Sequence, residues 1–162
     1  MKKIDNPDVI ITDVMDSHGK WRAKKPAVIC GDQRISWGEF NRKINRVANG
    51  LIGRGLQKGD KVSLLTTNRL EALEVLFGVV KAGGVIVPLS AMVPGDSLAR
   101  MVIDSDSRFL FIGPGQREVI GPYQSEFSNI SADGFFMLAE AVEGWHSYTS
   151  FVNGSSDEKT TI

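Results

Sequence analysis

The side chains in this sequence that could perform chemistry are few and lie far apart. The two histidines, His18 and His146, have no cysteine or carboxylate at the spacing of metal ligands, which argues against a zinc site. Asp104-Ser105-Asp106 resembles part of a calcium-binding loop, but the glycine and the terminal glutamate of that loop are missing, so we expect a turn at a helix end. The single cysteine, Cys30, falls in a strand predicted to be buried, where a thiol is inert.

One glycine-containing segment has some features of a phosphate-binding loop. Gly113-Pro114-Gly115 follows a predicted strand, as a dinucleotide-binding loop would. However, Glu118 stands at the third glycine position, and Pro114 removes an amide that should face phosphate. The glycine- and lysine-containing loop of nucleoside triphosphatases is also missing from the sequence. We therefore expect a plain turn at these glycines.

Two further groups of residues each allow two interpretations. Arg42, Lys43 and Arg46 share one face of a predicted helix and could attract an anion such as a nucleotide or coenzyme A phosphate. Because acidic and basic residues balance overall, a solvated helix face is the preferred interpretation. Trp145, His146 and Tyr148 could line a pocket, but we favour a packing anchor for the last helix. The sequence thus assigns no catalytic, cofactor-binding or metal-binding residue.

Composition limits the class of protein. The chain has 162 residues, 19 basic and 19 acidic side chains and zero formal net charge, whereas nucleic-acid-binding domains usually carry a basic excess. One cysteine cannot form an internal disulfide. No run reaches the ~18 apolar residues of a membrane span, and residues 1–8 lack the features of a signal peptide. These observations predict one domain of ordinary size in the cytoplasm.

Residues 36–52 give the clearest local signal. Ser36 and Glu39 have the spacing of a capping box, in which each side chain accepts a hydrogen bond from the other residue's backbone amide. Ile35 and Phe40 occupy the two positions of a hydrophobic staple. Apolar residues then recur with a period of 3.6 until Gly53, so we expect a helix with one buried face.

Strands and helices alternate through the rest of the chain. Strands are predicted at residues 27–30, 61–66, 85–87, 108–112 and 135–138, with Pro88 ending the third. Helices are predicted after Asn68, which can act as a cap, and at residues 94–105, 116–120 and 139–145. Alternation with short connections favours an α/β fold, with strand–helix units around a largely parallel sheet. Residues 147–162 are polar and predict a loop or frayed end.

Two of these segments resemble sequence motifs of a known family. The segment from Arg34 to Phe40 resembles the first core motif of the adenylate-forming enzymes, which include acyl-CoA synthetases, adenylation domains and luciferases. The segment from Val79 to Leu89 resembles their second motif. Gly59-Asp60-Lys61-Val62 and Asn68-x-x-Glu71 lie between the two in the family's order. The resemblance covers about residues 8–115.

The resemblance implies that residues 1–146 form the first subdomain of the family's large N-terminal domain, with residues 147–162 leading to a missing phosphate-loop region. The parent enzyme would be an ATP-dependent acid–thiol ligase, with acyl-CoA synthetase as our preferred choice. It would use ATP and Mg²⁺ with CoA, and this part would supply scaffold without activity or tight binding of these ligands. Implied partners are the rest of the parent chain and a carboxylic acid, with neither nucleic acid nor a membrane span; a homodimer stays open.

Two alternatives stay open as well. The chain could be a stand-alone α/β binding or interaction module without catalysis, as its charge balance and length allow. It could also be part of an enzyme that adenylates an aryl acid or an amino acid, because the family's later segments line the substrate pocket.

Overall fold

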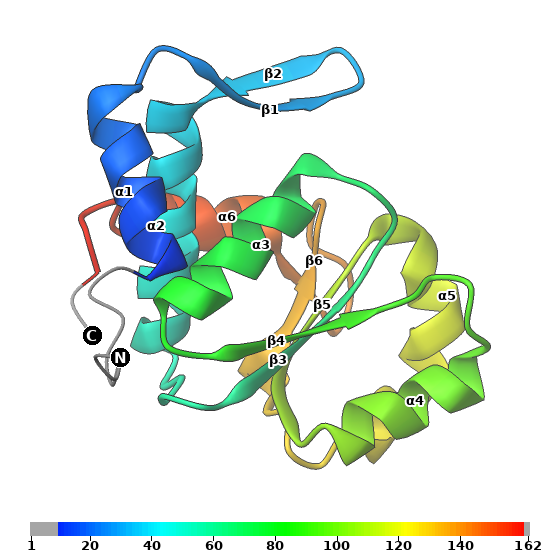
Figure 1. The fold of residues 1–162 in the computed structure, drawn as a ribbon. Helices are drawn as coiled ribbons and strands as arrows, with labels where there is room; N and C mark the ends of the chain where they lie inside the picture. The colour runs from blue at the N-terminus through cyan, green and yellow to red at the C-terminus, as the bar shows by residue number, and fades with distance from the viewer. Residues whose placement is uncertain (1–9, 161–162) are drawn as a thin grey trace, which may run out of the picture.

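A parallel sheet of five strands forms the centre of the molecule in a computed structural model that describes residues 10–160. The start of the chain, where no signal peptide was expected, lies outside the described residues. The strand order is β4-β3-β5-β6-β7, and all neighbouring strands are parallel. A separate antiparallel hairpin of β1 and β2 lies beside it (Figure 1). The strands are β1 (Pro26–Cys30), β2 (Gln33–Ser36), β3 (Lys61–Leu65), β4 (Val85–Leu89), β5 (Ser107–Ile112), β6 (Phe135–Met137) and β7 (His146–Ser147). The predicted α/β class with a mostly parallel sheet is confirmed.

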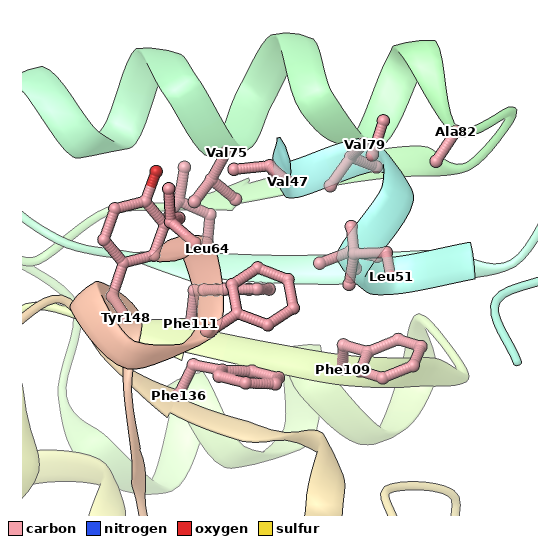
Figure 2. Close-up of a cluster of buried hydrophobic side chains, with 14 of the residues drawn as sticks. Val47, Leu51, Leu64, Val75, Val79, Ala82, Phe109, Phe111, Phe136 and Tyr148 are labelled. Atoms are coloured by element: carbon pink, nitrogen blue, oxygen red, sulfur yellow. The ribbon is translucent and has the colours of Figure 1, made fainter. Parts of the chain in front are cut away.

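Helices cover both faces of this sheet because successive residues of each strand point to opposite sides. In β5, Phe109 and Phe111 pack with α2, α3 and α6, whereas Leu110 and Ile112 pack with α4 and α5. Figure 2 shows the first of these clusters, in which the Phe111 and Phe136 rings stack with centroids 4.6 Å apart. The helices are α1 (Ile11–Trp21), α2 (Trp37–Gly53), α3 (Leu70–Lys81), α4 (Gly95–Asp104), α5 (Arg117–Ile120) and α6 (Tyr148–Asn153). Short 3₁₀ turns span Pro114–Gln116, Gly121–Glu126 and Ala132–Gly134.

The start of α2 confirms the capping box. The Ser36 hydroxyl accepts a hydrogen bond from the Glu39 amide at 3.3 Å, and the Glu39 carboxylate accepts one from the Ser36 amide at 3.0 Å. Hydrogen bonding from the Ser36 side chain, followed by its backbone amide, lowers the pKa of Glu39. Ile35 and Phe40 are both buried in one cluster, as the staple predicts.

Several predicted boundaries were wrong. Helix α3 begins at Leu70 after Arg69, so Asn68 does not cap it. Strand β4 continues through Pro88 to Leu89, which is tolerated because β4 is an edge strand and needs no donor on its open side. The helix expected at residues 139–145 is replaced by turns.

The polar segment expected to be a loop or frayed end also differs from the prediction. Its first part is helix α6, which buries Tyr148, Phe151 and Val152 against the sheet. Its later part, residues 154–160, runs along α2, where we call it the C-terminal strap. Asn49 donates to the Ser156 and Glu158 carbonyls at 2.8 and 3.0 Å, which holds the strap to the helix. The division of the chain at residue 146 stays a prediction.

Candidate functional site

The carboxyl ends of β3 and β5 mark the place in this sheet where a ligand site is expected. Helix α3 leads from β3 to β4 at one edge, and α4 returns the chain to β5 on the other side of β3. The loops that follow β3 and β5 therefore part from each other, and open α/β sheets bind ligands in the crevice that such a reversal creates. We call the loops at residues 66–69 and 113–116 the switch-point crevice.

Backbone and side chains approach closely inside this crevice. The Gly113 amide donates to the Leu65 carbonyl at 2.9 Å, and a Cβ atom on Gly113 would lie 2.5 Å from the Thr66 hydroxyl oxygen. Only glycine fits there without displacing Thr66. The hydroxyl oxygen of Thr66 and the amide oxygen of Gln116 are both buried and have no partner within residues 10–160. Buried polar atoms are nearly always paired, so these two oxygens are exceptions in the described part of the chain.

A hollow of about 380 Å³ opens beside the loop that follows β3. Most of its surface is apolar and comes from the hairpin, α3 and β4, and its polar side consists of residues 66–69. The apolar lining includes Ile29, Leu73, Leu76 and Leu89. A small cavity with an apolar body and one polar side suits a ligand that has a hydrocarbon part and a polar end.

Arg69 is fixed by side-chain contacts at this edge of the sheet. Its guanidinium pairs with Glu71 at 3.1 Å and donates to the Leu138 carbonyl, just after β6, at 3.1 Å. The second contact joins the start of α3 to the end of β6. Thr66 and Arg69 were not predicted as site residues. Thr66 ends the strand predicted at residues 61–66 and Arg69 follows it shortly, and this position at the carboxyl end of a parallel strand was the signal that could have found them.

Cys30 is half-buried and lines this hollow. The strand at this position is confirmed, but the prediction that it is buried was wrong, because β1 belongs to the two-stranded hairpin and not to the central sheet. The turn predicted at Gly113-Pro114-Gly115 is a 3₁₀ turn, as the missing third glycine indicated.

The other candidate ligands of a metal stay apart in the structure. His18 packs edge-on against Trp37, and His146 lies 3.5 Å from Asp133. Helix α4 ends at Asp104, so Asp104-Ser105-Asp106 forms the helix-end turn that was expected. Within residues 10–160, no three histidine, cysteine, aspartate or glutamate side chains come together to hold a metal ion.

Two of the three basic residues predicted on one face of α2 form ion pairs with other parts of the chain. Arg42, Lys43 and Arg46 line a surface hollow of about 430 Å³. However, Lys43 pairs with the buried Glu74 at 2.9 Å, and Arg46 pairs with Asp157 of the C-terminal strap at 3.6 Å. These contacts favour a structural role over an anion site.

Trp145 and Tyr148 serve as packing anchors, while His146 is exposed. The Trp145 ring meets Phe135 at 5.3 Å, and the Tyr148 hydroxyl donates to Glu74 at 2.6 Å. The helix that they were expected to anchor at residues 139–145 is not formed; they anchor β7 and α6 instead.

The described residues therefore offer a hollow with one polar side, and the assignment of no catalytic residue to them stays a prediction. They also include no helix long and apolar enough to cross a membrane.

Comparison with known proteins identifies a family and a fold for this chain. The family model described as AMP-binding enzyme matches residues 16–143. The crystal structure of the anthranilate CoA ligase AuaEII in complex with anthranoyl-AMP superposes with a TM-score of 0.87 at 21% identity, covering 100% of this chain and 30% of that one. This likeness concerns the fold, which is that of the N-terminal domain of adenylate-forming enzymes.

Two curated relatives agree on the class of reaction. A fatty acid–[acyl-carrier-protein] ligase, ScoC, of Streptomyces coeruleorubidus is 25% identical over 90% of this chain and 27% of its own length. A 4-hydroxybutyrate–CoA ligase of Metallosphaera sedula is 35% identical over 60% of this chain and 18% of its own length. The matched part thus spans about a quarter or less of these relatives. With the family model covering most of its length and the fold matching throughout, the chain belongs to the AMP-binding enzyme family.

Proposed function

We propose that this chain is the N-terminal part of an AMP-forming acyl-CoA synthetase. In that reaction a carboxylate oxygen attacks the α-phosphorus of ATP, which forms an acyl-adenylate and releases pyrophosphate. The thiolate of CoA then attacks the acyl carbon, which forms the thioester and releases AMP. The observation that carries the proposal is the family match over residues 16–143, since ATP use is common to AMP-binding enzymes.

The proposed role of residues 10–160 is scaffold. The hollow beside β3 has an apolar body and one polar side, which support binding but no chemical step. Mg²⁺ does not fit the described residues, because they bring no set of carboxylates together. We therefore propose that the 162-residue chain is inactive alone and that the metal, ATP and CoA are held by the rest of a longer cytoplasmic protein.

The acid and the thiol acceptor are proposed on general likeness. One relative joins a fatty acid to an acyl-carrier protein, and the other joins 4-hydroxybutyrate to CoA. Carrier protein and CoA both present a thiol, so the chemistry of the second step is the same for either acceptor.

The test begins with the mass of the native protein. An antibody against this segment should detect a band near 55–60 kDa, roughly the mass of an enzyme with several further domains. That protein, once purified, should catalyse acid-dependent exchange between pyrophosphate and ATP with 4-hydroxybutyrate or a fatty acid. The purified 162-residue chain should give background exchange. A native band at 17.7 kDa would contradict the longer parent, and exchange by the short chain would contradict its inactivity.

A further inference from the structure

A cluster of uncompensated positive charge follows helix α1. Four of the six residues from 20 to 25 are basic, namely Lys20, Arg22, Lys24 and Lys25, and all four are exposed. None of them pairs with a carboxylate of the described residues. Because the whole chain has zero formal net charge, the remainder carries −4. We call residues 20–25 the basic turn.

An apolar stripe leads along α1 into this turn. Ile11, Val14 and Trp21 follow helical spacing and are 51%, 37% and 76% exposed, while Met15, one turn after Ile11, is buried. The Lys20 ammonium lies 4.7 Å from the centre of the Trp21 ring. The exposed side of α1 therefore ends in an aromatic ring that contacts one lysine and is followed in sequence by Arg22.

The basic turn is held in place by the start of α2. The Trp37 amide donates to the Lys25 carbonyl at 2.9 Å, and the Gly38 amide donates to the Ala23 carbonyl at 3.0 Å. In Figure 1 the connection between α1 and β1 lies at an edge of the molecule, away from the parallel sheet. The charges are thus presented from a fixed backbone.

The acidic side chains of α1 do not neutralise the turn. The Asp13 carboxylate accepts from the Ile10 amide at 3.2 Å. Asp16 pairs with Lys81, which is almost fully buried, and with Lys159 at 3.2 Å. Burial raises the pKa of Asp16, but these two lysines outweigh that effect and lower it, so the carboxylate stays charged and occupied by its partners.

We propose that the apolar stripe and the basic turn together form a surface that binds an anionic phospholipid membrane from one side. An amphipathic helix with aliphatic and tryptophan side chains on its outer face can lie at the boundary of headgroups and acyl chains, and adjacent lysines and arginines attract anionic headgroups. The aliphatic residues have no counterpart on a nucleic-acid backbone, which is bound through its phosphates. The proposal stands on these contacts and charges and does not depend on the adenylation reaction.

Sedimentation with vesicles tests the charges. The 162-residue chain should bind vesicles of phosphatidylcholine with about 30% phosphatidylglycerol at low salt, bind phosphatidylcholine alone far more weakly, and dissociate as salt rises. Lys24→Gln with Lys25→Gln should weaken binding to the anionic vesicles about thirtyfold. The matched control is Lys58→Gln with Arg100→Gln, which removes the same charge from exposed positions elsewhere and should change binding less than about threefold.

A second pair of variants tests the apolar contact. Trp21→Ala should weaken vesicle binding about tenfold, whereas Met92→Ala, which truncates a side chain that is 94% exposed, should leave it unchanged. Circular dichroism would verify that each variant is folded. The proposal would be overturned if the lysine variant or Trp21→Ala bound vesicles as strongly as its control. It would also be overturned if the unaltered chain failed to bind anionic vesicles. Binding of single-stranded RNA that Lys24→Gln with Lys25→Gln abolishes, without vesicle binding, would overturn it in favour of a nucleic-acid surface.

Discussion

Glu74 is the residue whose surroundings depart most from what its type favours. Its side chain is fully buried on α3, where it accepts hydrogen bonds from Tyr148 at 2.6 Å and from Lys43 at 2.9 Å. Tyr148→Phe leaves this carboxylate with one fewer donor, so we expect a loss of about 1–3 kcal/mol in the free energy of unfolding. Urea unfolding would measure it. Tyr123→Phe removes a hydroxyl that has no hydrogen-bond partner within residues 10–160 and should change stability by less than about 0.5 kcal/mol; equal losses in the two variants would contradict the assigned hydrogen bond.

The same tyrosine predicts a dependence on alkaline pH. Burial, and then the charge of Glu74, raises the pKa of Tyr148 well above its ordinary value of 10.0. Below about pH 10 both the folded and the unfolded chain keep this proton, whereas above it the unfolded chain loses the proton and the folded chain does not. The contribution of Tyr148 to stability should therefore decline above pH 10, by up to about 1.4 kcal/mol per pH unit. Unfolding of the unaltered chain and Tyr148→Phe at pH 9, 10 and 11 should show a shrinking difference; a constant difference would contradict the raised pKa.

At the scale of elements, the contact between α2 and α3 depends on Gly78. A Cβ atom there would lie 2.4 Å from a Val47 methyl and 3.3 Å from the Ile44 carbonyl. Gly78→Ala should therefore push the helices apart and destabilise the fold by about 1–3 kcal/mol. Gly53→Ala is the matched control, since nothing lies within 4 Å of its Cβ position and it should be neutral or stabilise by up to about 1 kcal/mol. Thermal unfolding would compare them, and a neutral Gly78→Ala would show that the helices can shift without cost.

Elements with local signals could be predicted, and elements that depend on tertiary packing could not. The capping box of α2 lies within four residues and was confirmed. Helix α6 lies in a segment that is polar as a whole, and it forms because Phe151 packs on Phe111 and Phe136, which lie far away in the chain. Helix α1 was missed for a similar reason, since only Thr12 and Met15 are buried and its anchor is the Asp16–Lys81 ion pair with α3.

The part of the candidate site that has a local sequence signal could be predicted, and the part that depends on strand order could not. The turn at Gly113 followed from its own sequence and from the strand before it. Its contact with Thr66 exists because β5 lies next to β3 in the sheet and not next to β4. The alternation of strands and helices does not specify that order. The missing information was the strand order, without which Thr66 and Arg69 could not be brought to the same crevice.

At the scale of the whole molecule, the exposed edge of the sheet at β4 offers a test of whether further domains pack against this chain. Strand β4 has one neighbour, β3, and its Val85 is 49% exposed, with Met92 beyond the strand 94% exposed. Exposed edge strands with apolar side chains are normally covered or guarded by charges. If further domains of a longer enzyme cover this edge, the 162-residue chain should bind an apolar fluorescent dye and self-associate as its concentration rises.

The matched variants locate that surface. Val85→Lys with Met92→Gln should reduce dye fluorescence by about half and favour monomers in light scattering, because a charge and a polar amide replace the apolar contact. Thr149→Lys with Ser128→Gln introduces the same side chains at exposed positions away from that edge and should change neither measurement. A monodisperse monomer with little dye binding would instead favour a complete, stand-alone module, and a stable symmetric dimer that both variant pairs leave intact would place the self-association on another face.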